Sequence, residues 1–414
     1  MRVGERLDTR TGIPFRPESP VRSQRHVLRC RRSETEMPIE EAEYRERFAR
    51  VHKAIQDEDL DLLLVYSQGS RNMYANLLYL TGYYSFDPCL QGALLISRAG
   101  DPHLVLNFEW DLDRAARTSW MPRAAMHYSR DLPGEVAARC RTMGAAKGRI
   151  GLVGEGYMPL AVFRDLAHHL PEVEFVSVAH IVEGQRLIKS PAEIEAMRVA
   201  ARLTENATQA GFQALREGVS ELEILSVCVR SMLEGGADEP AFTAQVSFGK
   251  MTEVCMAPAS RNTLLRGDMV MFDMGCLYEH YVGDLSRTRV LGTPTADQRG
   301  IYDLVLTAQE AAIDFVRPGV TAEQVDTVAR DIISHAGYGG CFNHWLGRGE
   351  GLDLHERPFV EQGDSMPLRP GMVFSVEPGI YLPGVGGARV EEMVLVTDTG
   401  HEVISDMNHR DLAV

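Results

Sequence analysis

The chain has 414 residues, of which 44% are hydrophobic and 24% are charged, and its formal net charge is −15 at pH 7. These values are typical of a globular protein with two domains and exclude a collagen-like or wholly disordered chain. The negative charge is the wrong sign for coating phosphate backbones, so we expect no nucleic-acid partner. No apolar run reaches the roughly 20 residues that span a bilayer, so we expect no membrane partner either. The seven cysteines are scattered and lack the close spacing of a zinc site, which predicts free thiols and a cytoplasmic location.

Residues 1–36 differ from the rest of the chain. They contain nine arginines and no lysine against five acidic residues, and prolines at positions 14, 17 and 20 interrupt any helix. We expect a basic, disordered extension here, or a true start of the protein at Met37. A basic arm that binds nucleic acid is the alternative interpretation.

Residues 37–184 predict a small α/β domain. Residues 60–66 form an apolar run that indicates a buried strand, and residues 92–96 and 104–106 flank turn residues typical of a hairpin. Residues 149–153 predict another strand, followed by a stretch with helical apolar periodicity near residues 160–170. A second domain is expected over residues 185–414.

An internal repeat organises the second domain. Residues 216–223 are echoed by residues 317–324 at an offset of 101, and each copy ends one helix and opens the next with a capping box. Residues 267–273 are echoed by residues 371–377 at an offset of 104, and each copy is a turn followed by a buried strand that ends in a carboxylate. Two helix–helix–strand units related by a pseudo-twofold axis are therefore predicted, with Asp273 and Glu377 in equivalent places.

Each copy carries a second acidic residue. Asp284 lies eleven residues after Asp273, and Glu391 lies fourteen residues after Glu377. The intervening glycines allow the chain to turn back as a hairpin in each copy: Gly275 and Gly283 in the first, and Gly379, Gly384, Gly386 and Gly387 in the second. Four carboxylates that face one centre require positive charge, which divalent cations commonly supply in hydrolases. The sequence therefore predicts a metal site.

Five segments in order carry a resemblance to a known family. Residues 272–275, 283–288, 351–356, 376–381 and 389–391 resemble the motifs of the pita-bread family, which includes creatinase, prolidase and aminopeptidase P. The resemblance implies an α/β N-terminal domain followed by an α+β pita-bread domain, in which a pseudo-twofold curved antiparallel sheet is flanked by helices. It also implies a homodimer in which the N-terminal domain closes the partner's site.

The family's metal ligands are Asp, Asp, His, Glu and Glu, and the resemblance assigns four of them to Asp273, Asp284, Glu377 and Glu391. The histidine is missing, because Arg348 lies seven residues before His355, where the family has its ligand. His344 would need a shifted loop to replace this missing histidine ligand. The family's catalytic histidine is also missing, because Met256 aligns with it. A guanidinium group has no lone pair for a metal, so the sequence predicts one divalent ion, with manganese, iron and zinc all suitable. Metal-free operation, as in the creatinase branch, is the alternative.

These observations predict a hydrolase that cleaves a C–N bond in a small amino-acid-derived substrate or an Xaa-Pro-like peptide. Glu377 is expected to act as a general base or a second-site ligand, and His355 to contact the substrate or a metal-bound water. Arg348 is expected either to neutralise the acidic residues or to bind a substrate carboxylate. A lyase that acts on a small zwitterion and an inactive binding module on the same fold are the alternatives.

Overall fold

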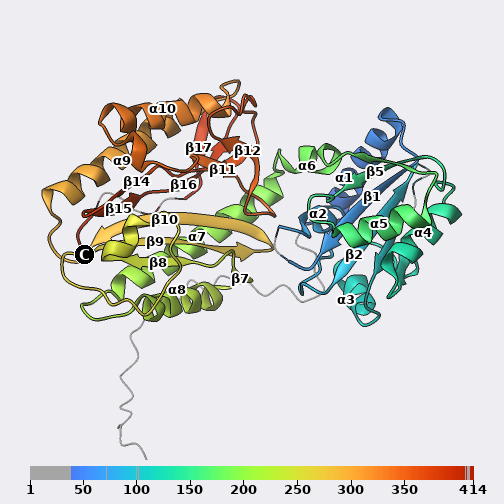
Figure 1. Cartoon of the computed structure of the whole chain (residues 1–414), viewed down its shortest axis with the longest axis horizontal. Coiled ribbons are helices and arrows are strands. Elements are labelled where there is room, and N and C mark those ends of the chain that lie inside the picture. The colour runs from blue at the N-terminus through green and yellow to red at the C-terminus, as the bar shows by residue number, and fades with distance from the viewer. Residues whose placement is uncertain (1–38, 71, 99, 101, 406, 408–410) are drawn as a thin grey trace, which may run out of the picture. The chain divides into compact units, whose positions relative to one another are not determined.

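The computed structural model describes residues 39–414, apart from residues 71, 99, 101, 406 and 408–410 (Figure 1). The extension predicted for residues 1–36 lies outside the described residues. Across these described ranges, every helix is too short or too polar to cross a lipid bilayer.

The N-terminal domain is a six-stranded sheet in the order β4-β3-β2-β1-β5-β6, with helices on both faces. Its strands are β1 (Leu62–Gln68), β2 (Gln91–Ser97), β3 (Pro102–Leu106), β4 (Met126–Tyr128), β5 (Arg149–Val153) and β6 (Glu174–Ser177). Its helices are α1 (Glu41–Asp57), α2 (Ala75–Thr81), α3 (Asp111–Thr118), α4 (Leu132–Thr142), α5 (Leu160–His169) and α6 (His180–Arg186).

Successive side chains of β1 point to opposite faces of the sheet, which explains why helices cover both faces. Leu63 and Val65 pack with apolar side chains of α1 and α2, whereas Leu62 and Leu64 pack with those of α4 and α5. Successive side chains of a strand point to opposite faces, so an uninterrupted apolar run requires a helical layer on each side. The predicted strands, the antiparallel β2–β3 hairpin and the predicted helix near residues 160–170 are confirmed.

The C-terminal domain contains two main sheets and one short hairpin. The first sheet has the order β10-β9-β7, with β8 also paired to β9; the second has the order β12-β11-β13-β16-β17; and β14 pairs with β15. The strands are β7 (Glu239–Pro240), β8 (Gln245–Phe248), β9 (Met269–Tyr278), β10 (Tyr281–Val290), β11 (Gly347–Gly349), β12 (Glu356–Val360), β13 (Val373–Val376), β14 (Gly379–Leu382), β15 (Gly386–Arg389), β16 (Glu392–Val396) and β17 (His401–Val403). The helices are α7 (Pro191–Gln213), α8 (Glu221–Gly235), α9 (Ala296–Phe315) and α10 (Ala322–His335).

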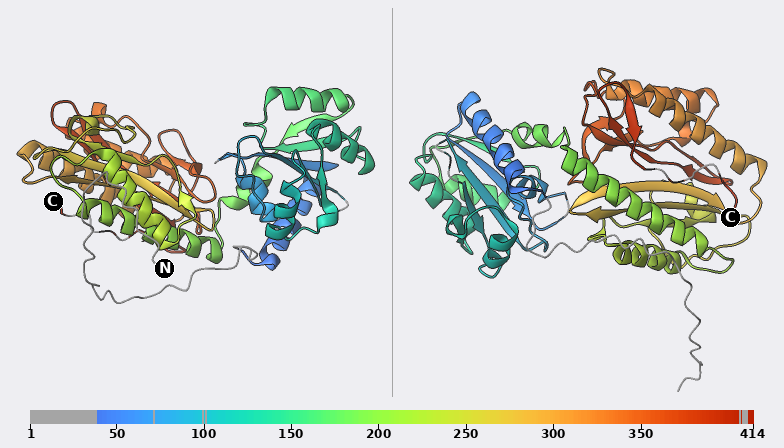
Figure 2. Two further views of the ribbon diagram at one scale, coloured as in Figure 1. Left: turned by 90° about the horizontal axis from the view of Figure 1, so that it is seen from below. Right: turned by 180° about the vertical axis from the view of Figure 1, so that it is seen from behind.

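The predicted repeat is confirmed by the order of these elements. Helices α7 and α8 precede β9, and helices α9 and α10 precede β13. Ser220 and Thr321 each close a capping box at the start of the second helix of the pair. Helix α7 packs on the β9–β10 hairpin, and α8 packs on α7 and β8. Helices α9 and α10 pack on the later strands of the domain (Figure 2).

The two hairpins that carry the acidic residues turn in different ways. The predicted hairpin is confirmed by the antiparallel pairing of β9 and β10, but its turn is formed by Glu279 and His280, with positive φ angles of 50° and 69°, and not by Gly275 and Gly283. Both glycines lie within the strands, where a Cβ atom on Gly283 would come 2.3 Å from a backbone atom of Ala200 in α7. Gly283 therefore allows α7 to pack closely on the hairpin. In contrast, the β14–β15 turn does contain glycines with positive φ angles, at positions 384 and 386.

Candidate active site

The hairpin register places the first two acidic residues on one face. In β9 and β10, Asp273 lies opposite Ser286 and Asp284 lies opposite Gly275, so the two aspartates are two positions apart across the pair. Residues separated by an even number of positions share a face of the sheet. In the other copy, Glu377 directly follows β13 and Glu391 directly precedes β16, so these two residues lie on either side of the β14–β15 hairpin.

Three of the four predicted acidic residues form a compact group. Carboxylate oxygens of Asp273, Asp284 and Glu391 lie within 4.8 Å of one another, and all three residues are buried. Oxygen ligands of this kind suit divalent cations, so the donor chemistry of this trio fits one such ion. Glu377 is the fourth residue, and it is joined to the trio through Arg348.

The Arg348 side chain extends from β11 into the acidic residues. Its Nη2 atom donates to Asp284 Oδ2 at 2.5 Å, and its Nη1 atom lies 3.3 Å from Glu377 Oε1 and 3.3 Å from Glu391 Oε1. The prediction that this arginine is close to the acidic residues agrees with these distances. A permanently charged guanidinium among three carboxylates neutralises part of their negative charge.

Glu350 is an acidic residue of this site that the sequence interpretation missed. Its Oε1 atom accepts a hydrogen bond from Arg348 Nη1 at 2.7 Å, and the side chain is 0% exposed. The hydroxyl of Ser375 accepts from the same Nη1 atom at 2.7 Å and donates to Glu377 Oε1 at 3.1 Å. Burial raises the pKa of Glu350 well above its ordinary value, against the opposing charge of Arg348.

Arg389 is a second residue that the sequence interpretation missed. Its Nη2 atom forms an ion pair with Asp273, and its Nη1 atom donates to the Tyr381 hydroxyl at 2.8 Å. Gln245 pairs with Asp273 across β8 and β9 and donates to Asp273 Oδ2 at 2.7 Å. The same amide group lies 3.2 Å from the sulfur of Met256, which is 67% exposed. Met256 and Asp273 therefore both contact the amide nitrogen of Gln245.

We call the seven ionisable residues that meet here the carboxylate cluster: Asp273, Asp284, Glu350, Glu377, Glu391, Arg348 and Arg389. Five carboxyl groups and two guanidinium groups give a formal charge of −3 when all are ionised. Burial raises the pKa of Asp284 to about 7, although the charge of Arg348 opposes this shift. The cluster is thus short of positive charge, and one divalent ion would reduce the deficit to a single charge.

The two histidines near the cluster have different environments. His344 Nδ1 donates to the Trp345 carbonyl at 2.7 Å, and its Nε2 accepts from the Tyr381 hydroxyl at 3.0 Å. Both ring nitrogens are therefore engaged away from the acidic trio, so His344 does not replace the missing ligand. The ring of His355 packs against Trp345 at 5.7 Å between centroids and lines a cavity of about 520 Å³. Burial and the charge of Arg348 lower the pKa of His355 to about 4, so its imidazole is neutral at pH 7.

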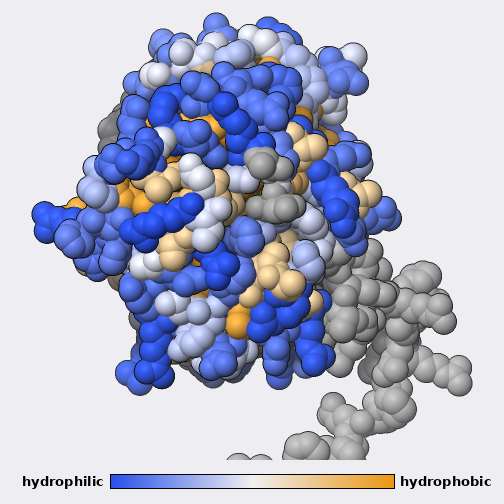
Figure 3. Space-filling view, turned by 90° about the vertical axis from the view of Figure 1, so that its right-hand side faces the viewer, coloured by the Kyte–Doolittle hydropathy of each residue, from blue (hydrophilic) through white to orange (hydrophobic). Residues whose placement is uncertain are grey.

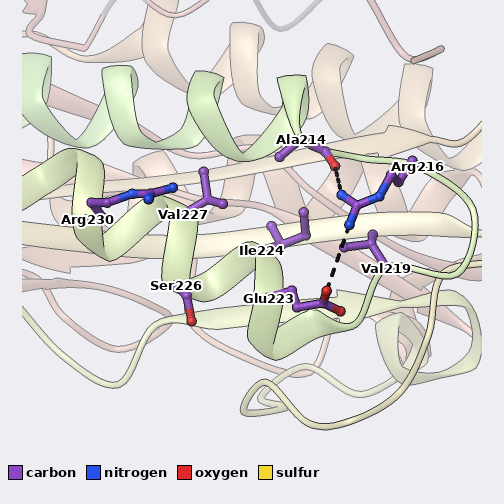
Figure 4. A pocket seen from close by; sticks show the side chains of 8 residues that line it. All are labelled: Ala214, Arg216, Val219, Glu223, Ile224, Ser226, Val227 and Arg230. Atoms are coloured by element: carbon purple, nitrogen blue, oxygen red, sulfur yellow. Dashed lines mark hydrogen bonds and ion pairs between the residues drawn. The ribbon is translucent and has the colours of Figure 1, made fainter. Parts of the chain in front are cut away.

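A second hollow, of about 480 Å³, lies where α8 meets the segment between α7 and α8 (Figure 4). Arg216 and Glu223 form an ion pair of 3.8 Å there, and both side chains are more than half exposed. None of the predicted site residues lines this hollow. The carboxylate cluster remains the candidate active site.

Comparisons with known proteins identify the family of both domains. Residues 195–398 match the model of metallopeptidase family M24, and residues 47–188 match that of the creatinase/prolidase N-terminal domain. An Xaa-Pro dipeptidase of Lactobacillus helveticus is 33% identical over 368 residues, which cover 86% of this chain and 98% of the relative. An Xaa-Pro dipeptidase of Pyrococcus horikoshii is 39% identical over 256 residues, which cover 62% of this chain and 73% of the relative.

Solved structures give the same result for the fold. The prolidase of Pyrococcus horikoshii OT3 superposes with a TM-score of 0.79 at 30% identity and covers 88% of this chain and 99% of its own. An Xaa-Pro dipeptidase of Bacillus anthracis superposes with a TM-score of 0.81 at 27% identity and covers 90% of this chain and 100% of its own. The predicted architecture, an α/β domain followed by a pita-bread domain, is confirmed.

Proposed function

Because the chain belongs to metallopeptidase family M24, we propose that it hydrolyses a C–N bond in a small amino-acid-derived substrate, with Xaa-Pro dipeptides as the first candidates. The single observation that carries the proposal is the buried trio of Asp273, Asp284 and Glu391, with carboxylate oxygens within 4.8 Å of one another. Relatives named Xaa-Pro dipeptidases support the substrate class.

The trio would hold one divalent ion, for which manganese, iron and zinc are all chemically suitable. When bound, such an ion lowers the pKa of a water molecule and polarises a carbonyl group. We propose one ion for each chain, because the Arg348 guanidinium supplies the remaining positive charge beside Glu377 and Glu391. Both terminal nitrogens of Arg348 already contact protein carboxylates. This favours charge neutralisation over binding of a substrate carboxylate.

Glu377 is the general base in this proposal. Burial raises the pKa of its carboxyl group, against the opposing charges of Arg348 and Arg389, which moves it toward the range useful for proton transfer near neutral pH. The Ser375 hydroxyl donates to Glu377 Oε1 and fixes the orientation of the carboxylate. The neutral imidazole of His355 would donate a hydrogen bond to the substrate, because it carries one N–H group and no charge.

We test the activity with a panel of Xaa-Pro dipeptides, the corresponding Xaa-Ala dipeptides and small amides, assayed with added manganese. The expected result is release of an amine or amino acid from at least one member, and loss of that activity with a chelator. Glu377→Gln is the matched variant, since it keeps the shape of the side chain and removes the base. The absence of hydrolysis for every compound, with folded protein, would reject the proposal.

We also propose a homodimer, in which the N-terminal domain of one subunit closes the site of the other. The side chains of Phe86 and Trp110, in the N-terminal domain, are each 56% exposed, and their rings lie 6.3 Å apart. The coloured part of the face drawn in Figure 3 is mostly hydrophilic, with small separate apolar patches. Exposed aromatic residues are enriched at interfaces, so Phe86 and Trp110 are candidate contacts. A monomer by light scattering, with full activity, would contradict the dimer.

A further inference from the structure

Glu350 is a buried carboxyl group that the proposed mechanism does not use. It directly follows β11, two positions after Arg348. Its Oε1 atom accepts from Arg348 Nη1, whereas its Oε2 atom has no hydrogen-bond partner in the described part of the chain. Burying a charged group with so few partners costs stability, so its presence requires an explanation.

The contacts of Arg348 Nη1 differ in length, and the difference indicates the role of Glu350. Nη1 lies 2.7 Å from Glu350 Oε1 and 2.7 Å from Ser375 Oγ, but 3.3 Å from the nearest oxygens of Glu377 and Glu391. The two short contacts of Nη1 are thus to residues outside the acidic trio, whereas Nη2 donates to Asp284 Oδ2, a member of the trio, at 2.5 Å. Glu350 holds this nitrogen at a greater distance from Glu391, which is one of the trio, and from Glu377.

We propose that Glu350 is a positioning residue that fixes Arg348 as a built-in cation of the site and holds its Nη1 atom at the longer distance of 3.3 Å from Glu377 and Glu391. Without the Glu350 carboxylate, the guanidinium is drawn toward the remaining acidic residues and competes with the metal ion for their oxygens. This inference rests on the proposed function, because it assumes that the trio holds a divalent ion. It assigns Glu350 no contact with substrate or metal.

The test is calorimetric titration of manganese into metal-free protein. Glu350→Gln should raise the dissociation constant by about 10-fold or more, the range typical for residues that support metal ligands. Asp111→Asn is the matched control: it changes a buried acidic residue paired with Arg114 in the N-terminal domain, and should leave the dissociation constant unchanged. Circular dichroism verifies that each variant is folded.

The same substitution made in an Arg348→Met variant distinguishes a positioning role of Glu350 from a simple loss of its charge. In Arg348→Met protein, Glu350→Gln should change the dissociation constant by less than about twofold, because Glu350 then has no guanidinium to hold. Equal changes in the two backgrounds would show that Glu350 acts through its charge alone and would overturn the inference. An unchanged constant for Glu350→Gln in the otherwise native chain would also overturn it.

Glu350→Asp keeps the test decisive if Glu350→Gln fails to fold. Aspartate retains the charge but is one methylene shorter, so it should also weaken manganese binding, whereas a pure charge effect predicts no change. Failure of the proposed function has a different signature, because the unmodified protein would then bind no manganese at all. Tight binding by the unmodified protein and equally tight binding by both Glu350 variants would reject the positioning role alone.

Discussion

Two buried groups of ionisable side chains differ in their charge balance. In the first, Arg186 lies 2.6 Å from Asp353 and 2.5 Å from Glu356, and Lys189 lies 3.2 Å from Glu356, so two cations meet two carboxylates. In the carboxylate cluster, two guanidinium groups meet five carboxyl groups. The first group is balanced in formal charge, whereas the carboxylate cluster carries an excess of negative charge when all its members are ionised.

The pKa values of the carboxyl groups follow this difference only in part, because burial keeps the pKa of Asp353 raised although Arg186 is its partner. Burial alone would raise the pKa of Glu356, but the charges of Arg186 and Lys189 lower it to about 2. Burial raises the pKa of Asp284 to about 7, because the single nearby guanidinium of Arg348 does not offset burial and the neighbouring carboxylates. We infer that the balanced group stabilises the fold, while the carboxylate cluster is organised for binding and chemistry.

The largest expected effect on stability comes from removing a positive charge from the carboxylate cluster. Arg348→Ala leaves several carboxylates without their cation, and breaking a buried ion pair of this kind costs about 3–5 kcal/mol. We expect the free energy of unfolding of the metal-free protein to fall by that amount in urea titrations. Added manganese should recover part of the loss. An unchanged unfolding midpoint would mean that Arg348 does not neutralise the cluster.

A smaller effect is expected from removing a proposed ligand. Asp284→Asn keeps the shape of the side chain but removes one negative charge from the trio, so manganese affinity should fall by more than about 100-fold, beyond the loss typical of supporting residues. Calorimetric titration measures this directly. The metal-free variant should be no less stable than the unmodified protein, since a buried charge is gone. Retained affinity would exclude Asp284 as a ligand.

In the group of Arg186, Lys189, Asp353 and Glu356, removing an acidic residue should lower stability and leave metal binding unchanged, the opposite of the result expected for Asp284→Asn. Glu356→Gln should destabilise the fold by about 1–3 kcal/mol, because it weakens the pairing of Arg186 and Lys189, and should leave metal binding unchanged. The pKa of Glu356 is lowered on folding, so its stabilising contribution is present above its ordinary value of 4.5 and is lost as the pH falls toward about 2. Unfolding titrations between pH 6 and roughly 3 should show the variant losing less stability than the unmodified protein. Equal pH dependence would contradict this assignment.

Arg348→His sharpens the comparison, because it removes the internal cation, as Arg348→Ala does, and puts a metal ligand in its place. A neutral imidazole at this position, beside Glu377 and Glu391, would complete the family's ligand pattern. We expect the variant to bind a second manganese ion and to lose activity on the native substrate. Calorimetric titration beside a kinetic assay tests both halves. Unchanged stoichiometry and unchanged kinetics together would place Arg348 outside the functional site.

Local sequence patterns predicted much of this arrangement. The offsets of the repeat and the capping residues identified the paired helices, the repeat brought Asp273, Asp284 and Glu391 together, and the family resemblance placed Arg348 beside them. These features could be predicted because each depends on residues close together in the sequence, or on a repeat of them.

The remaining features depend on contacts between distant segments. The ion pair between Arg389 and Asp273 joins residues 116 positions apart, and no local pattern marks it. Glu350 lies only two positions from Arg348, but its burial follows from strands that are placed later in the chain. The turn at Glu279 and His280 was missed because glycines are the usual signal for positive φ angles, and neither residue is glycine.

The central claim is that one divalent ion, together with the guanidinium groups of Arg348 and Arg389, neutralises the carboxylate cluster. Elemental analysis of the purified protein, after dialysis against metal-free buffer and reloading with manganese, tests this most directly. The account predicts one tightly bound equivalent for each chain. Two tightly bound equivalents for each chain, or none, would contradict it.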